Sequence, residues 1–175
     1  MSSFDTAREM WETFHMNNAR NSREAAKNGD PEAMEILAYS IWHIQYNCED
    51  EVIELLTAAS DAGRETASWK LADKYAAKGD KEYHDKIEYY CRRALSGGRR
   101  FSHVSDDPIE GCLSGSIFNW INTHHPEWME MEEGFLGDGQ YYLCPTGRYG
   151  MNVFRGIGKK AATEERKKLI PKDKN

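Results

Sequence analysis

The first half of the chain contains the stretch Ala25-Ala26-Lys27-Asn28-Gly29-Asp30-Pro31-Glu32-Ala33-Met34-Glu35-Ile36-Leu37-Ala38. A related stretch begins 34 positions later, Ala59-Ser60-Asp61-Ala62-Gly63-Arg64-Glu65-Thr66-Ala67-Ser68-Trp69-Lys70-Leu71-Ala72. Both follow the pattern Ala-x3-Gly-x3-Ala-x3-Leu-Ala. Residues four apart lie on one face of a helix, so the alanines let a neighbouring helix approach while the leucines fill the space beside it. A repeat of this length indicates an array of helix pairs.

The boundaries of the repeated helices are marked by residues that favour helix ends. Asp30 is suited to cap a helix that has Pro31 at its first position, because proline needs no hydrogen-bond acceptor there. Gly63 and Gly97 stand where a left-handed residue is expected to end a helix. We therefore expect helices near 4–28, 31–46, 48–62, 64–78 and 81–96, with a break of the first helix near Asn17-Asn18 as the alternative.

The two copies of the pattern resemble the Sel-one-like repeat, a subtype of the tetratricopeptide class, over residues 19–98. The glycine-rich loop typical of that family is missing at Tyr46-Asn47-Cys48. The resemblance implies a short right-handed α-solenoid of antiparallel helix pairs that serves as an adaptor or protein-binding scaffold and carries no catalytic residues. Because solenoids need capped ends, we expect the 4–28 helix to cover one end, with Phe4, Met10, Trp11 and Phe14 facing the stack.

The second half of the chain does not continue the repeat. A helix is expected at 108–121, and two strand-like runs at 140–144 and 149–154 flank a Pro/Gly turn that is typical of a β-hairpin. From Lys159 the chain is strongly charged and predicts a short exposed helix with a frayed end. The expected organisation is a repeat domain at 1–98, a capping region at 99–158 and a basic tail at 159–175, in a mainly α fold.

The charge is distributed unevenly along the sequence. The formal net charge is −6, with −12 over residues 1–138 and +6 over residues 139–175. An acidic body argues against a general nucleic-acid coat, and the basic end has to be considered separately.

No apolar run reaches the length of a membrane-spanning helix, and the first residues lack the pattern of a signal peptide. With four cysteines that form no close pair, the expected location is the cytoplasm.

Three groups of residues are candidates for chemical sites. His124-His125, with His103, Cys112 and the 127–133 acidic run, has no standard metal-ligand spacing. Cys144 has no signature of a Cys–His nucleophile around it, and the late glycines form no phosphate loop. We therefore expect no catalytic residues, no metal and no cofactor. The basic residues that could contact phosphate or nucleic acid are Arg155, Lys159 and Lys160.

A protein-binding surface is the remaining candidate. In stacked helix pairs the first helices line the concave face, through which we expect the chain to bind its partner, and large aromatic side chains anchor interfaces when they are exposed. Trp42 and Trp69 are the key aromatics of this surface, unless they pack inside the fold.

The expected role of the protein is a non-enzymatic adaptor or inhibitor. The alternatives are a small enzyme or ligand-binding unit in the C-terminal half, nucleic-acid contact by the basic tail, and acidic mimicry of nucleic acid. The oligomeric state stays open. The expected partner-binding residues are Glu35, Tyr39, Trp42, His43, Trp69, Lys70 and Asp73.

Overall fold

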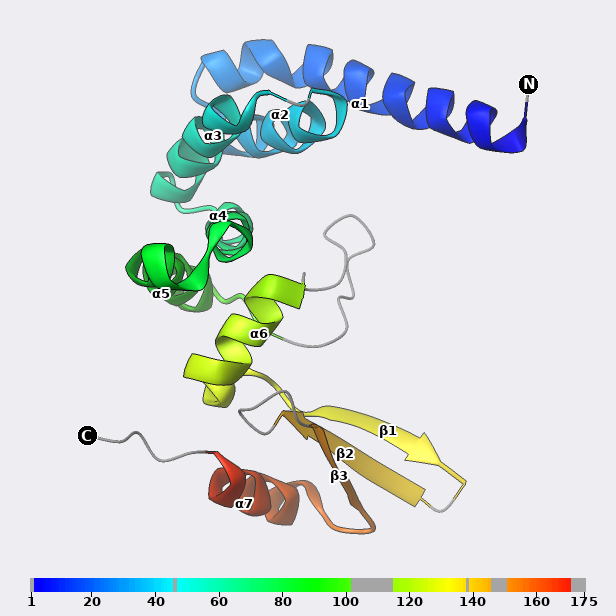
Figure 1. Cartoon of the computed structure of the whole chain (residues 1–175), viewed down its shortest axis with the longest axis vertical. Coiled ribbons are helices and arrows are strands. Elements are labelled where there is room, and N and C mark those ends of the chain that lie inside the picture. The colour runs from blue at the N-terminus through cyan, green and yellow to red at the C-terminus, as the bar shows by residue number, and fades with distance from the viewer. Residues whose placement is uncertain (1, 46, 102–114, 138, 146–150, 171–175) are drawn as a thin grey trace. The chain divides into compact units, whose positions relative to one another are not determined.

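The computed structural model describes residues 2–45, 47–101, 115–137, 139–145 and 151–170. In this part of the chain the fold is mainly helical, as predicted, with seven α-helices and one small antiparallel sheet (Figure 1). No helix of the described ranges is both long and apolar enough to cross a membrane. The chain divides into two compact units. The first comprises Met1–Lys74 with Asp85–Arg99, and the second comprises Tyr75–His84 with Arg100–Asn175.

The first unit is built from consecutive helices whose bounds agree with the sequence pattern. Helices neighbouring in sequence pack on one another, α1 on α2 and α2 on α3. Ser60 Oγ in α3 lies 2.7 Å from Ser68 Oγ in α4, and Arg93 in α5 donates to the Ser60 carbonyl oxygen over 2.6 Å. The helices are α1 (Ser3–Lys27), α2 (Pro31–Ile44), α3 (Glu49–Asp61), α4 (Glu65–Lys78) and α5 (Asp80–Ser96), of which the end of α4 and the start of α5 belong to the second unit.

The helix ends follow the expected chemistry, with one correction. The Asp30 side chain accepts hydrogen bonds from the backbone N–H groups of Glu32 and Ala33 over 3.0 and 3.3 Å, which confirms the predicted cap. Gly63 has φ +97°, as expected, but the left-handed residue after α5 is Gly98, at φ +94°, and not Gly97. Gly97 is required for a different reason: a Cβ there would lie 2.5 Å from the Cβ of Glu65.

The repeated small and apolar positions form the core of the helices, as the pattern predicts. Ala38 and Ala72 have no exposed surface, and neither do Ala59 and Ala67. Because alanine keeps the helix backbones close, large neighbours fill the remaining space. The large core residues at repeat positions are Leu37, Ile41, Leu56, Leu71, Tyr75 and Ile87.

The N-terminal helix does not cover its neighbour in the expected way. Its second half packs on α2 through His15, Ala19, Ser22 and Ala26, and Trp11 touches α2 through the ring of His43. At a rise of 1.5 Å per residue, the 25-residue α1 is roughly 37 Å long while the 14-residue α2 is roughly 21 Å long. The first part of α1 therefore extends beyond α2 (Figure 1). The expectation that its apolar residues face the stack is wrong for Phe4, Met10 and Phe14, which are exposed. Trp11 does face α2, with its ring 5.3 Å from that of His43, although 47% of its side chain is exposed.

The second unit contains a helix, a short 3-10 turn, a three-stranded sheet and a final helix. The predicted hairpin is confirmed as β2 (Gly139–Pro145) paired with β3 (Met151–Arg155). A third strand, β1 (Glu132–Leu136), pairs antiparallel with β2 and was not predicted, because its glutamates resemble a charged loop. The remaining elements are α6 (Gly115–His124), η1 (Pro126–Trp128) and α7 (Lys159–Leu169); residues 108–114 of the predicted 108–121 helix lie outside the described ranges.

The predicted C-terminal helix is confirmed as α7, but the expectation that it is exposed is wrong for one face, which is buried. Ala162 of α7 is fully buried in a cluster with Tyr142 and Cys144 of β2. Arg166 donates to the carbonyl oxygens of Pro126 and Met129, which holds α7 against η1. The tail therefore belongs to the fold of the second unit up to the end of α7. The other large buried residues of this unit are Phe101, Ile117, Trp120, Ile121 and Met129.

Candidate functional site

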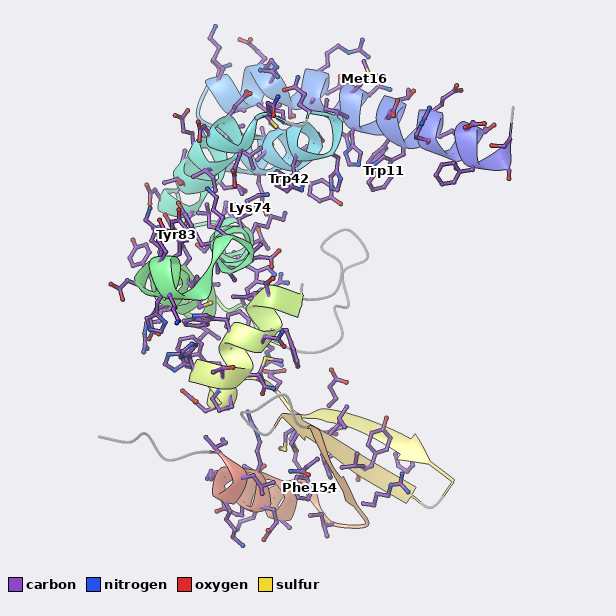
Figure 2. The ribbon with its side chains drawn as sticks, viewed as in Figure 1. Trp11, Met16, Trp42, Lys74, Tyr83 and Phe154 are labelled. Atoms are coloured by element: carbon purple, nitrogen blue, oxygen red, sulfur yellow. The ribbon has the colours of Figure 1, made fainter. Side chains whose placement is uncertain are left out.

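The most exposed aromatic residue of the predicted binding face is Trp42, on α2. Its side chain is 48% exposed and lies under the Lys74 ammonium of α4, with Nζ 3.1 Å from the ring centroid (Figure 2). Lys70 Nζ lies 5.5 Å from the ring centroid of Tyr39. These cation–π contacts hold the aromatic rings in place while leaving part of the Trp42 surface open to a partner. We name the Trp42 face by its residues: Tyr39, Trp42 and His43 of α2 with Lys70 and Lys74 of α4.

A buried carboxylate fixes α4 against α2 behind this face. Glu35 is only 4% exposed, and its carboxylate accepts hydrogen bonds from three side chains. Lys70 Nζ lies 2.8 Å from Oε1, while Arg64 Nε and Thr66 Oγ1 lie 2.9 and 2.8 Å from Oε2. Burial opposes ionisation of Glu35, but Lys70, Thr66 and Arg64 outweigh it and hold the pKa of Glu35 below its usual range. The two helices therefore present one pre-organised surface.

Two residues expected to point outward are buried. Glu35 lies between α2 and α4 in the network just described, and Trp69 is only 6% exposed. The guanidinium carbon of Arg99 lies 5.6 Å from the Trp69 ring centroid. Sequence spacing placed both on the outer side of their helices, but it did not show that contacts from residues far along the chain would cover them. Among the other predicted residues, Trp42 and His43 are exposed, and Tyr39, Lys70 and Asp73 are half-buried.

A histidine that the sequence analysis did not single out lies beside the Trp42 face. His15 is fully buried, and neither of its ring nitrogens has a hydrogen-bond partner. Its ring stacks on His43 with the centroids 4.6 Å apart, and the Trp11 ring lies 4.3 Å from it. Burial lowers the pKa of His15, and burial together with the neighbouring His15 and Lys74 lowers that of His43. The available signal was the spacing of His15 with Ala19, Ser22 and Ala26, which puts it on the face that meets α2.

The residues considered for metal binding or nucleophilic chemistry do not converge in the described ranges. His125 stacks on Trp128 with centroids 3.7 Å apart and pairs with Glu127 over 3.0 Å, whereas the His124 ring lies 5.0 Å from that of Trp120. No three potential metal-ligating side chains of the described residues lie together. Cys144 is fully buried, and this burial raises the pKa of its thiol, which disfavours the reactive thiolate. His103 and Cys112 lie outside the described residues.

The three basic residues considered for phosphate contact lie on two elements of the second unit. Arg155 ends β3, opposite Tyr141 of β2, while Lys159 and Lys160 begin α7. Lys159 Nζ lies 2.8 Å from Glu133 Oε1, and this hydrogen bond raises the pKa of Lys159. Further along α7, Lys167 and Lys168 pair with Glu164 and Glu165 over 3.1 and 2.6 Å. Much of the positive charge is therefore balanced locally, although Lys160 is exposed.

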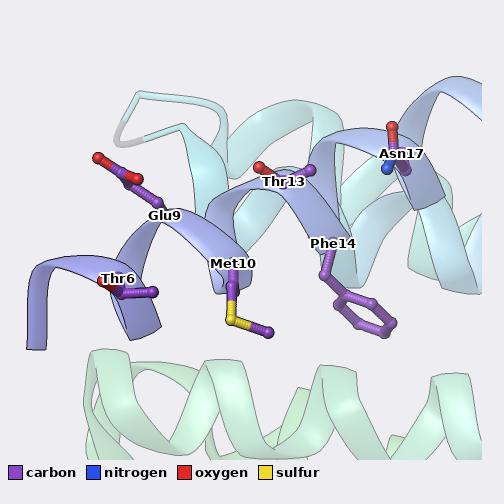
Figure 3. Close-up of a pocket in the computed structure, with 6 residues that line it drawn as sticks. All are labelled: Thr6, Glu9, Met10, Thr13, Phe14 and Asn17. Atoms are coloured by element: carbon purple, nitrogen blue, oxygen red, sulfur yellow. The ribbon is translucent and has the colours of Figure 1, made fainter. Parts of the chain in front are cut away.

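A shallow depression runs along the exposed part of α1 (Figure 3). Its lining comes from this one helix and combines threonine and asparagine side chains with Glu9, Met10 and Phe14. These groups offer an apolar surface with a polar edge, which suits a packed partner better than a reacting small molecule. Comparison with protein-family models, with curated proteins and with solved structures finds no match to this chain.

Proposed function

We propose that this chain is a non-enzymatic protein-binding module, a short Sel-one-like solenoid that acts as an adaptor or inhibitor. It binds its partner through the Trp42 face. The observation that carries the proposal is the half-exposed indole of Trp42, held between α2 and α4 by Lys74. Exposed aromatic residues on a rigid support are typical centres of protein interfaces.

The support behind Trp42 explains why this face suits binding. Glu35 ties α2 to α4 through hydrogen bonds from Thr66 and Lys70, and to Arg64 just before α4, so the side chains of both helices are ordered before a partner arrives. A pre-organised surface loses less conformational entropy on association, which leaves more of the contact energy as affinity. The charged Lys74 and the imidazole of His43 border the indole and supply polar contacts at the rim.

The chemistry of the buried polar groups favours binding over catalysis. The carboxylate of Glu35 is already occupied by hydrogen bonds within the fold, and the thiol of Cys144 lies in the core of the second unit. A general base or a nucleophile must reach a substrate. These two groups therefore serve the stability of the fold in this proposal.

Affinity capture of partners with the full chain as bait tests the proposed function. Trp42→Ala is the test variant and Ile36→Ala the control, because both residues are on α2 with similar exposure, 48% and 42%. Six positions apart, they lie on different sides of the helix. We expect a specific partner to be captured by the original chain and by Ile36→Ala, and lost with Trp42→Ala. Equal recovery with both variants, measured by quantitative mass spectrometry, would contradict the proposed face.

A further inference from the structure

The part of α1 that extends beyond α2 carries a regular apolar seam. We name residues 3–14 the α1 overhang. Phe4 and Trp11 are seven positions apart, and Ala7 and Phe14 are also seven apart, which are the a and d spacings of a two-heptad coiled coil. Phe4 is 73% exposed and Trp11 47% exposed, so the seam is largely uncovered. It lies on a helix that needs a second helix to bury it.

The seam is confined to the overhang. In the following heptad the corresponding positions are occupied by Asn18 and Asn21, which end the apolar pattern. From there on, α1 packs on α2 through His15, Ala19, Ser22 and Ala26. Trp11 also touches α2, because its ring lies 5.3 Å from that of His43, but 47% of its side chain stays exposed. The packing of the first unit therefore does not explain Phe4, Phe14 or the open part of Trp11.

We propose that the α1 overhang binds the overhang of a second copy of this chain, as an antiparallel helix pair with twofold symmetry. In an antiparallel pair each a position meets a d position of the other helix. Phe4 then meets the second copy's Phe14, and Trp11 meets its Ala7. The small alanine leaves room for the large indole in each of the two central layers. A parallel pair would instead place indole against indole beside a layer of two alanines, which combines a steric conflict with a void.

The charges of the overhang are compatible with this self-association. Its acidic residues are Asp5, Glu9 and Glu12, at heptad positions b and f, away from the seam. The positions that flank the seam within the overhang are Ser3, Arg8 and Met10, and none carries a carboxylate. Arg8 also pairs within the helix, its Nε 3.8 Å from Glu12 Oε1. Two overhangs can therefore approach without placing carboxylates opposite each other in the interface.

The exposed area indicates a weak dimer. A buried aromatic side chain covers roughly 150–250 Å², so three half- to three-quarter-exposed aromatics leave on the order of 300 Å² for each copy. With Met10 and Ala7, two copies would bury about 1,000 Å², which is the low end for specific interfaces. We therefore expect a dissociation constant on the order of 10 µM. The dimer is independent of the proposed function, because the variants that test it, at Phe4 and Phe14, leave the Trp42 face unchanged.

Sedimentation equilibrium of the full chain between about 5 and 300 µM, a range chosen around the expected constant, tests the proposal. Phe4→Gln and Phe14→Gln remove seam residues while keeping good helix formers. Met16→Gln is the control, because Met16 is 60% exposed and points away from the side of Trp11 and Trp42 (Figure 2). We expect a monomer–dimer equilibrium that the two seam variants weaken at least tenfold and the control changes less than twofold. Circular dichroism verifies that all variants remain helical.

Two results would overturn this inference: a purified chain that stays monomeric throughout the tested concentration range, or a dimer that the seam variants do not weaken.

The antiparallel orientation of the two overhangs is tested by a separate cross-linking experiment. Chains carrying Phe4→Cys are mixed with chains carrying Phe14→Cys, and the unmodified chain controls for the natural cysteines. The antiparallel pair predicts oxidative cross-links mainly between the two different variants. Cross-links mainly within each variant would establish a parallel pair and contradict the proposed geometry.

Discussion

Replacing Lys70 by methionine tests whether the buried Glu35 network holds α4 against α2. The Lys70 ammonium lies 2.8 Å from Glu35 Oε1, and the two side chains are only 22% and 5% exposed. Methionine keeps most of the aliphatic length of lysine, so the substitution removes the charge with little change in packing. Glu35 then remains buried with Arg64 and Thr66 as its hydrogen-bond donors.

The expected cost is about 2 kcal/mol in the free energy of unfolding. A hydrogen bond to a charged group contributes roughly 1.5–3 kcal/mol, and leaving a buried charge without its partner costs roughly 3–5 kcal/mol. Because two donors to Glu35 remain in the variant, the loss should correspond to the smaller of these two contributions, that of a single hydrogen bond to a charged group. With a urea m-value of about 2 kcal/mol/M for a protein of this size, the midpoint of urea unfolding should fall by about 1 M.

The difference in the free energy of unfolding between the original chain and Lys70→Met should depend on pH. Lys70, Thr66 and Arg64 hold the folded-state pKa of Glu35 below its unfolded value in spite of burial. The resulting stabilisation is therefore present above the unfolded pKa, near 4.3, and is lost as the pH falls through the folded pKa. Urea unfolding at pH 7 and at progressively lower pH should show the gap between the original chain and Lys70→Met shrinking in acid.

Lys81→Met is the matched control, because it removes an exposed lysine from α5. Its effect should stay within about 0.5 kcal/mol. A loss of less than about 0.5 kcal/mol for Lys70→Met at pH 7 would refute the structural role of this ion pair. A gap that persists unchanged in acid would refute its assignment to the ionised Glu35.

Two other predictions concern the packing of the first unit. Burial lowers the pKa of His15, so the unfolded chain binds the proton more readily than the folded chain, and stability should fall as the pH drops below about 6.5. His15→Phe should show a smaller decrease in melting temperature between about pH 7.5 and 5.5 than the original chain. An identical decrease in both proteins would contradict the assignment of this pH dependence to His15. Gly97→Ala should cost about 1–3 kcal/mol in urea unfolding, since its Cβ would lie 2.5 Å from that of Glu65. Gly137→Ala, whose added Cβ would meet no atom within 4 Å, should be close to neutral, and equal effects at both sites would refute the argument.

The sequence predicted the local structure of the first unit well. The alanine and leucine periodicity identified buried positions such as Ala38 and Leu71, and Asp30 with Pro31 marked a helix start. These features depend on residues close together in the chain, where spacing determines which side chains share a face. The pairing of β2 with β3 was also predictable, because the sequence has a proline and a glycine between two β-favouring runs.

Features that depend on distant contacts were not predictable in the same way. The burial of Glu35 requires donors 29–35 positions later in the sequence. The exposure of Phe4 and Phe14 depends on where α2 ends, and the hydrophobic pattern of α1 contains no such information. In the candidate site, the pattern identified Trp42 but could not distinguish it from Trp69, which has the same residue type on the next helix pair and is buried.

The central claim is that the Trp42 face binds a partner protein. Once a partner has been captured and purified, calorimetric titration against the chain measures its dissociation constant directly. Trp42→Ala should raise this constant at least tenfold, which corresponds to about 1.4 kcal/mol, a typical lower bound for a central interface aromatic. Ile36→Ala should change it less than twofold. Equal dissociation constants for the original chain and for Trp42→Ala would contradict the account.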